Sequence, residues 1–333
     1  IYSGKEPIMS REMLEAVIRT YIKTCETPEV TFNWHGGEPL LLGKDFFRQV
    51  LAFEKEYADG KVINNTIQTN GTLIDREWAD IFKQGNFLTG ISVDGPSRIH
   101  DKYRRDRSGS ATLDKVINAI SIMHEAEADF NTMTTINKES ERKGLEVYHF
   151  LKSIGSRFMQ FMPVMEHIRD GRIVPPDTPG AQMAHWSVSD VGFGRFMCDI
   201  FDEWIRTDVG KYFVGHFDAA LALWCGVQPG TCAYAETCGG NAIIEHNGDV
   251  YTCDHYVYPE YRLGNIQTDS LRDMLTSEKM IRFGISKRNS LPDKCRSCRW
   301  RELCNGECPK HRFSSSNTGE KGLSALCRGY KMF

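Results

Sequence analysis

The 333-residue sequence lacks a long apolar run, a surplus of charge of one sign and any internal repeat. No apolar stretch approaches the roughly 18 residues that cross a bilayer, so a membrane-spanning helix is not expected. Lys plus Arg total 41 and Asp plus Glu total 44, for a net charge of −3. This balance offers no electrostatic basis for binding nucleic acid or a lipid surface. The content of 41% hydrophobic and 26% charged residues is typical of a globular protein.

Cysteine is nearly absent from the first two thirds of the chain, where Cys25 is the only one before Cys198, and Cys225 follows. These three lie in apolar helical patterns and are predicted to be buried, inert thiols. The other eight of the eleven cysteines fall in the last third, at Cys232, Cys238, Cys253, Cys295, Cys298, Cys304, Cys308 and Cys327. A chain of this size without a secretion signal does not need so many disulfides, which favours sulfur ligation of metal.

Up to about residue 165, short β-rich runs alternate with amphipathic helical patterns, beginning with a helix that Ser10 caps. The expected strands cover residues 30–34, 63–69, 87–94, 130–136 and 158–163. Such alternation predicts parallel strands joined by right-handed crossovers, in either a barrel or an open sheet. Residues 166–190 are polar and contain Pro and Gly, which predicts a loop or bridge. An aromatic-rich helix is expected after it.

Three of the expected strands end in small or polar residues. The ends read His-Gly-Gly-Glu-Pro at 35–39, Gln-Thr-Asn-Gly at 68–71 and Ser-Val-Asp-Gly-Pro at 92–96. Parallel α/β proteins bind ligands at the carboxyl ends of their strands. Any one of these runs is equally what an ordinary turn uses. Three successive ends of the same character together predict a ligand site.

The cysteine spacing is C-x5-C-x14-C from Cys232 and C-x2-C-x5-C-x3-C from Cys295, with Cys327 following alone. A His-Asn-Gly turn at 246–248 lies between two short β-rich runs and predicts a hairpin. Eight cysteines suffice for two four-thiolate sites, and the tight C-x2-C pair presents two sulfurs from one turn. Two zinc sites and two iron–sulfur clusters both satisfy this spacing.

The strand ends and the cysteine array together resemble radical S-adenosylmethionine (SAM) enzymes with a SPASM domain, and among them the anaerobic sulfatase-maturating enzymes. Cys-Asp-His-Tyr at 253–256 and Leu-Gly-Asn-Ile at 263–266 are particularly similar to that family. The resemblance covers nearly the whole chain. It implies an α/β fold, a partial (β/α)6 TIM-like radical SAM barrel without its first strand, followed by a loop-rich, cysteine-ligated SPASM domain.

The implied domains are the N-terminally truncated barrel over 1–166, a bridging helical region over 167–230 and the SPASM domain over 231–333. The implied enzyme is an oxidoreductase that cleaves SAM reductively at a [4Fe–4S] cluster. The resulting 5′-deoxyadenosyl radical takes a hydrogen from the Cβ of a Cys or Ser in an unfolded sulfatase segment, and the product is Cα-formylglycine. The implied partners are that peptide and an electron donor such as flavodoxin or ferredoxin, with no nucleic acid and no membrane. A cytoplasmic location is expected.

The resemblance also assigns the cysteines to two auxiliary [4Fe–4S] clusters. The first thiol set comprises Cys232, Cys238, Cys253 and Cys308. The second thiol set comprises Cys295, Cys298, Cys304 and Cys327. The family holds its reactive cluster in a C-x3-C-x2-C loop, which these 333 residues do not contain, so we expect its ligands upstream of residue 1 in a longer, active protein. A protein of these 333 residues alone is expected not to cleave SAM.

Matching positions imply that SAM is bound by Gly36, Gly37, Glu38, Asn70, Ser92, Arg104 and Met165. Gly37 would let the backbone approach the methionyl amino group. Ser92 and Arg104 match positions that contact the ribose and methionyl carboxylate region, where a guanidinium suits a carboxylate. Met165 matches a position beside the adenine. Without the family, the charged surroundings of Arg104 would indicate only a solvated side chain.

Asp254 is the predicted catalytic residue, because oxidising a side-chain thiol or hydroxyl requires removal of its proton as well as an electron. A turn after a hairpin would also use an aspartate. His255 is a second candidate base that we interpret as a supporting residue. Two alternative functions stay open. One is a SPASM-type maturase of another peptide or natural-product precursor, and the other is a zinc- or cluster-stabilised binding module without SAM chemistry.

Overall fold

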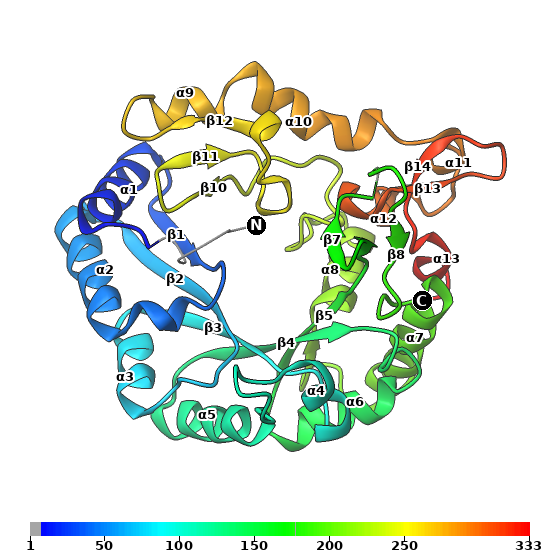
Figure 1. Ribbon diagram of the computed structural model, residues 1–333, viewed down its shortest axis with the longest axis horizontal. Helices are drawn as coiled ribbons and strands as arrows, with labels where there is room; N and C mark the ends of the chain where they lie inside the picture. Colours follow the sequence, from blue (N-terminus) through cyan, green and yellow to red (C-terminus); the bar gives the residue numbers. More distant parts are fainter. Residues whose placement is uncertain (1–7, 177) are drawn as a thin grey trace.

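The computed structural model describes residues 8–176 and 178–333, so residues 1–7 of the expected barrel and residue 177 of the expected bridge lie outside the described residues. A curved six-stranded parallel sheet lines the inside of the barrel (Figure 1). Its strands, in sheet order, are β1 (Glu29–Trp34), β2 (Val62–Thr69), β3 (Phe87–Ser92), β4 (Phe130–Ile136), β5 (Phe158–Pro163) and β9 (Phe213–Val214). All five neighbouring pairs are parallel, as the alternating pattern predicted.

Helices cover the outer face of this sheet (Figure 1). They are α1 (Arg11–Thr24), α2 (Lys44–Tyr57), α3 (Arg76–Gln84), α4 (Ser97–Tyr103), α5 (Leu113–Ala126), α6 (Gly144–Ser153) and α7 (Asp190–Thr207). The predicted cap at Ser10 is confirmed, and Asp75 caps α3 in the same way. The Ser10 hydroxyl accepts a hydrogen bond from Met13 N at 3.2 Å, and the Asp75 carboxylate accepts one from Trp78 N at 3.0 Å.

The two faces of the sheet differ in polarity. Outward side chains such as Phe32, Ile67 and Phe161 are buried in one core with the helices. The alternate positions, such as Asn33 and Gln68, point inward and stay accessible. A closed eight-stranded barrel fills its interior with branched apolar residues. Here the accessible inner face carries both polar and apolar side chains, and the amino-terminal halves of the strands line a cavity of about 650 Å³.

Residues 166–190 are more ordered than the predicted loop or bridge. They form a three-stranded antiparallel sheet of β6 (His167–Arg169), β7 (Arg172–Val174) and β8 (Gln182–Met183), in the order β7-β6-β8. The β6–β7 turn is Asp170-Gly171, and both residues have positive φ. An Asp-Gly pair is a strong hairpin signal, so the sequence held this information in a segment too short to show an alternating pattern.

The last third of the chain completes the ring opposite the sheet (Figure 1). Its elements are α8 (Gly215–Trp224), β10 (Ile243–Ile244), β11 (Asp249–Tyr251), β12 (Arg262–Asn265), α9 (Leu271–Leu275), α10 (Glu278–Asn289), α11 (Asp293–Arg296), α12 (Arg301–Cys304), β13 (Ser314–Ser315), β14 (Lys321–Leu323) and α13 (Cys327–Tyr330). β10, β11 and β12 form an antiparallel sheet, and the predicted hairpin at 246–248 is confirmed.

Helix α1 joins the barrel to the last third, because it is apolar on two sides. Leu14 and Ile18 are fully buried in the core beneath the sheet. Met13 and Val17 belong to a separate buried cluster with residues of the last third, namely Val250, Ile266, Leu271 and Met274. Gly248, at the tip of the hairpin, has φ +83° and lies so close to α1 that a Cβ there would meet Met13 Cε at 2.9 Å. The hairpin is therefore seated directly on α1.

The end of the chain returns to α7 through a pair of glycines. A Cβ on Gly329 of α13 would lie 2.2 Å from the Asp190 carbonyl oxygen, and a Cβ on Gly194 of α7 would lie 2.8 Å from Gly329 Cα. Such close backbone approach needs glycine on both helices. It brings Cys327, the first residue of α13, back toward the barrel.

All eleven cysteines are free thiols. Of the three outside the thiol sets, Cys25 and Cys198 are half-buried, but Cys225 is exposed, so its predicted burial is wrong. Helix α8 packs Phe217, near its start, in the core, but Trp224 at its end is 67% exposed, so Cys225 lies beyond the buried part of the helix. Among residues 8–176 and 178–333, no helix combines the length and apolarity needed to cross a bilayer.

A buried carboxyl on α2 makes stability depend on pH. Burial raises the pKa of Glu54 from 4.5 to about 7, and the hydrogen bond from Asn65 Nδ2 only partly offsets this. Between these values the folded protein binds a proton that the unfolded chain does not, so stability falls as pH rises through this window. We expect Glu54→Gln to unfold like the parent protein at pH 4.5. At pH 8 it should be more stable by on the order of 3 kcal/mol.

Anaerobic urea unfolding at the two pH values measures this difference. Glu56→Gln, at an exposed position of the same helix, is the matched control and should leave the pH dependence unchanged. Parallel pH profiles for the parent and Glu54→Gln would contradict the assignment.

Candidate functional site

Glu38 ties the ends of β1 and β2 together at the carboxyl edge of the sheet. Its Oε1 accepts hydrogen bonds from the Thr69 hydroxyl at 2.7 Å and from Leu40 N at 3.1 Å. Its Oε2 accepts one from Asn70 N at 2.8 Å. One carboxylate thus satisfies two backbone N–H groups at separate strand ends. Glu38, which was predicted to bind SAM, has a positioning role in this structure.

Gly36 and Gly37 form an open backbone surface beside Glu38. Both have positive φ, +105° and +58°, which L-residues with side chains rarely adopt. A Cβ built on either one meets no protein atom within 4 Å. The glycines are therefore required by their backbone conformation, and they leave N–H and C=O groups accessible to a ligand on the inner side of the barrel.

Arg104 is neither isolated nor simply solvated. Its Nε and Nη2 donate to the two carboxylate oxygens of Asp94, at 2.7 and 3.1 Å, and the Asp94 side chain is only 3% exposed. Asp94 also accepts hydrogen bonds from the backbone and hydroxyl of Thr135 on β4. The guanidinium is therefore fixed at the ends of β3 and β4, and Nη1 takes no part in this bidentate pair.

A buried imidazole supports this pair from behind. His100 of α4 is fully buried, and burial lowers its pKa to about 4, so the ring is neutral near pH 7. Its Nδ1 accepts from Asp94 N at 3.2 Å, which leaves the proton on Nε2, 3.2 Å from Thr112 Oγ1. The Thr112 hydroxyl donates to the Arg104 carbonyl. His100 thus fixes the backbone on both sides of the ion pair, a role that the sequence did not indicate.

The other predicted SAM residues lie at the same edge of the sheet or close to it. The Ser92 hydroxyl accepts from Gln68 Nε2 at 3.1 Å, and both side chains are on the inner face. Asn70 uses Oδ1 to accept from Thr72 N, which shapes its own turn. Met165, just beyond β5, is 6% exposed and packs in the barrel core.

Within each predicted thiol set, the cysteines interact electrostatically with one another. In the first thiol set, the pKa of Cys308 is raised to about 12. Burial is the main cause, and neighbouring negative charges, including those of Cys232 and Cys238, add to it. Burial and then other groups, Cys308 among them, raise the pKa of Cys253. All four members are therefore linked by repulsion between their thiolate forms.

The second thiol set is linked in the same way. Burial raises the pKa of Cys295, and the negative charges of Cys327 and Cys298 raise it further. Burial, and more weakly Cys327 and Cys295, raises the pKa of Cys304 to about 11. Crowded, partly buried thiols that repel one another as thiolates fit sites in which bound metal supplies the compensating positive charge. In the described residues, no three thiol, imidazole or carboxylate groups converge on one point as ligands of a single ion. Each thiolate of a [4Fe–4S] cluster binds its own iron atom, so such a cluster does not need that convergence.

Asp254 lies where the first thiol set faces the barrel. Its Oδ1 accepts from Cys253 Sγ at 3.1 Å. Partial burial raises its pKa, but His255, Cys253 and His35 together lower it below the ordinary value, so the carboxyl is ionised near pH 7. His35 directly follows β1 and precedes the two glycines. The predicted catalytic carboxylate therefore interacts electrostatically with the strand end that was predicted to bind SAM.

Two further contacts connect the barrel side of the site to the loops after the first thiol set. Lys310, two residues beyond Cys308, forms an ion pair with Glu166 at 3.6 Å. The rings of His167 on β6 and Phe313 contact edge to face, with centroids 4.5 Å apart. The site is thus enclosed by the carboxyl ends of the strands, the β6–β8 sheet and the loops of the first thiol set.

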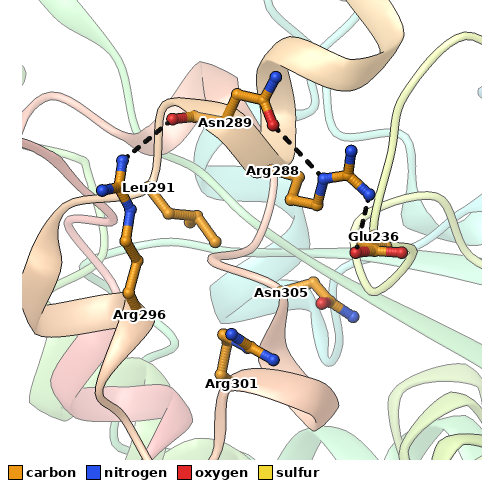
Figure 2. Close-up of a pocket in the computed structure, with 7 residues that line it drawn as sticks. All are labelled: Glu236, Arg288, Asn289, Leu291, Arg296, Arg301 and Asn305. Atoms are coloured by element: carbon orange, nitrogen blue, oxygen red, sulfur yellow. Dashed lines mark hydrogen bonds and ion pairs between the residues drawn. The ribbon is translucent and has the colours of Figure 1, made fainter.

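A basic pocket of about 350 Å³ adjoins the second thiol set (Figure 2). Arg288 from α10, Arg296 from α11 and Arg301 from α12 surround it, and Glu236 is the one carboxylate among its lining residues. Arg296 donates to the Asn289 carbonyl at 3.2 Å, while Arg288 pairs with Glu236 at 3.3 Å. Cys295, which directly precedes Arg296, and Cys304, three residues after Arg301, belong to the second set.

Comparison with known proteins agrees with this geometry. Residues 1–151 match the radical SAM superfamily, and residues 232–299 match SPASM, an iron–sulfur cluster-binding domain. The chain is 43% identical to the serine-type anaerobic sulfatase-maturating enzyme of Bacteroides thetaiotaomicron, over 98% of this chain and 80% of that protein. It is 32% identical to the cysteine-type enzyme of Clostridium novyi, over 98% and 85%. The solved structure of native anSMEcpe with bound AdoMet and Kp18Cys peptide superposes with a TM-score of 0.86 at 28% identity, covering 98% of this chain and 87% of that one.

The barrel, its ligand-facing strand ends and the two thiol sets thus define a radical SAM oxidoreductase with a SPASM domain. Within that class, the chain belongs to the anaerobic sulfatase-maturating enzymes. The predicted family and fold are confirmed. The alternative of a zinc-stabilised binding module is not supported, because the matched domain is an iron–sulfur cluster-binding domain and the relatives are enzymes.

The two thiol sets can be tested separately by iron content. Cys253→Ala removes one ligand of the first set and Cys298→Ala one ligand of the second, and an incomplete ligand set costs both metal affinity and folding free energy. Each variant, purified anaerobically, should lose about four iron atoms per chain relative to the parent protein.

Cys225→Ala is the control, because Cys225 belongs to neither set, and it should retain all the iron. Iron and sulfide analysis with absorption spectra provides the measurement. Undiminished iron in Cys253→Ala or in Cys298→Ala would disprove the corresponding ligand assignment.

Proposed function

We propose that this enzyme oxidises a serine or cysteine of a sulfatase peptide to Cα-formylglycine, with SAM and [4Fe–4S] clusters as its cofactors. The observation that supports this most directly is the electrostatic contact between Asp254, beside the first thiol set, and His35 at the end of β1. Such a carboxylate can accept a proton beside both a SAM-type strand end and a cluster-type thiol set. The relatives include both serine-type and cysteine-type enzymes, and the solved relative holds a peptide.

The functional groups at the strand ends are of the kinds that can bind the separate parts of SAM. We propose that the open backbone at Gly36 and Gly37 receives the methionyl amino group, with Glu38 and Asn70 shaping that edge. The Arg104 guanidinium, fixed by Asp94, faces the methionyl carboxylate, and Ser92 meets the ribose. Met165 contributes apolar surface beside the adenine. When bound, SAM and its cluster supply the 5′-deoxyadenosyl radical that abstracts hydrogen from the substrate Cβ.

Asp254 accepts the remaining proton. Conversion of a serine CH₂OH group to an aldehyde removes two electrons and two protons in all, of which the radical takes one hydrogen atom. The second electron would pass to a cluster held by the thiol sets. An ionised carboxylate beside the substrate hydroxyl or thiol takes the second proton. Thiol ligands must lose their protons to bind metal, so the bond that Cys253 donates to Asp254 belongs to the protonated thiol, and cluster assembly releases that carboxylate oxygen.

Asp254→Asn tests this role in the intact enzyme. The amide cannot accept a proton at neutral pH, so formylglycine formation should fall by about 10²- to 10⁴-fold. Iron content and the cleavage of SAM to 5′-deoxyadenosine should persist. Mass spectrometry of a serine and a cysteine sulfatase peptide, after incubation with SAM and reductant, measures the product.

Asp273→Asn, an exposed position on α9, is the control and should turn over normally. Normal product formation by Asp254→Asn would remove Asp254 from the mechanism. Failure of the parent enzyme on both sulfatase peptides, with a thioether crosslink formed in another peptide, would instead favour the natural-product maturase.

The described parts of the chain support the proposed division into a barrel over 1–166, a bridging region over 167–230 and a SPASM domain over 231–333. The β6–β8 sheet starts at His167, and the first cysteine of the sets is Cys232. A reducing compartment such as the cytoplasm is part of the proposal, because eleven free thiols persist where disulfides do not form.

An acidic electron donor, such as flavodoxin or ferredoxin, is the proposed redox partner. Its carboxylates are complementary to the pocket of Arg288, Arg296 and Arg301 (Figure 2), which adjoins the second thiol set. Opposite charge at an interface speeds encounter and fixes orientation. Docking there would place the donor beside the α11 and α12 loops that carry three of the four thiols of the second set.

Reversing two of these charges should slow reduction by the donor. We expect Arg296→Glu combined with Arg301→Glu to lower flavodoxin-driven turnover roughly tenfold at low salt, and to weaken its dependence on ionic strength. Turnover driven by dithionite, a small reductant, should be unchanged. Arg272→Glu combined with Arg282→Glu, two exposed arginines that do not line the pocket, is the control. Equal flavodoxin rates in both double variants would exclude this docking surface.

A further inference from the structure

Lys287 of α10 is fully buried, with none of its surface exposed to solvent. Its Nζ donates three hydrogen bonds to main-chain carbonyls, at 2.8 Å to Cys232, 2.8 Å to Ala233 and 2.5 Å to Ala235. Three donated bonds require three N–H groups, which the ammonium form has and the neutral amine does not. The geometry therefore specifies a positive charge in the interior of the protein.

The charge of Lys287 faces the first thiol set. Its Nζ binds the Cys232 carbonyl, and Gly284, one turn earlier on α10, accepts a hydrogen bond from Cys238 N at 3.0 Å. The ionisable groups that act on it most strongly are Cys238, Arg312, Cys232 and Cys308. Burial lowers the pKa of Lys287, and the thiolate forms of these cysteines raise it. A buried charge is costly unless it is paired. In this protein, the anionic groups able to pair with it are metal-ligating thiolates.

Arg312 extends the same arrangement toward the second thiol set. Its Nη1 donates to the Lys287 carbonyl at 2.5 Å, and its Nη2 donates to the carbonyls of Asn305 and Glu307. Residues 305–307 all have left-handed φ values, from 47° to 72°, and join Cys304 of the second set to Cys308 of the first. Arg312 thus fixes the turn that separates the two sets, whereas Lys287 fixes the loop that begins with Cys232.

We propose that Lys287 is the fixed buried countercharge of the first auxiliary cluster, and that it holds the reduction potential of that cluster above the value it would otherwise have. The proposal rests on the cluster assignment of the proposed function. A cluster bound by four thiolates is anionic and gains one negative charge on reduction. A fixed cation beside it therefore stabilises the reduced form more than the oxidised form. Lys287 acts through the cluster and its loop, so it is a positioning residue and does not contact substrate.

The test replaces the charge in the intact, cluster-loaded enzyme. Lys287→Met removes both charge and hydrogen bonds, Lys287→Gln keeps donors without charge, and Lys287→Arg keeps charge. Anaerobic redox titration followed by electron paramagnetic resonance reports each cluster separately from catalysis. In Lys287→Met and Lys287→Gln we expect the equilibrium constant for reducing one cluster to fall about tenfold, a shift of 59 mV for one electron. The other clusters should titrate as in the parent enzyme.

Lys279→Met is the matched control, because Lys279 is an exposed lysine of the same helix that donates to the Arg262 carbonyl. Its cluster potentials should equal those of the parent. Unchanged potentials in both neutral variants would overturn the proposal. If neither neutral variant retains the first cluster, retention of full iron by Lys287→Arg supports the requirement for charge, and loss of iron there as well overturns it. A parent enzyme without auxiliary iron would instead refute the proposed function itself.

Discussion

The arrangement of the last third of the chain depends on its eight thiols, which in the proposed function ligate clusters in two interleaved sets. This region buries few large apolar side chains compared with the barrel, and several of its elements are helices or strands of two to five residues. Small, loop-rich modules of this kind are usually held by crosslinks or metal. The buried Lys287 and the half-buried Arg312 fit the same principle, since positive charge is stable in that interior only beside anionic groups. Metal, thiolate and cation therefore act as one unit in place of a hydrophobic core.

The barrel contributes the opposite kind of surface. Its outer face packs in an apolar core, whereas its inner face carries accessible polar and apolar side chains, and six strands leave an open arc in which a ligand can bind. Glu38, Asp94 and His100 satisfy the strand ends from within the protein, so the backbone at Gly36 and Gly37 remains available. The Asp254 loop then faces this edge from the other half of the chain, and the site exists only where both halves meet.

Much of this architecture was predictable from local sequence. The five strands before residue 165 and the caps at Ser10 and Asp75 follow from periodicity and side-chain chemistry within a few residues. The division of the thiols into two sets did not follow from spacing, because Cys308 lies between two members of the other set. It came from the resemblance to a family. The Asp94–Arg104 pair, the role of His100 and the burial of Lys287 depend on residues brought together by the fold, so no local pattern indicated them.

The packing of helix α1 on two sides limits how its length can vary among related proteins. Its two apolar sides lie at fixed angles around the helix axis, one toward the sheet and one toward the hairpin and α9. Insertion or deletion of a single residue within it would rotate everything downstream by about 100°. Whichever side kept its place, the other would lose its contacts, so relatives should tolerate substitutions along α1 far better than changes in its length.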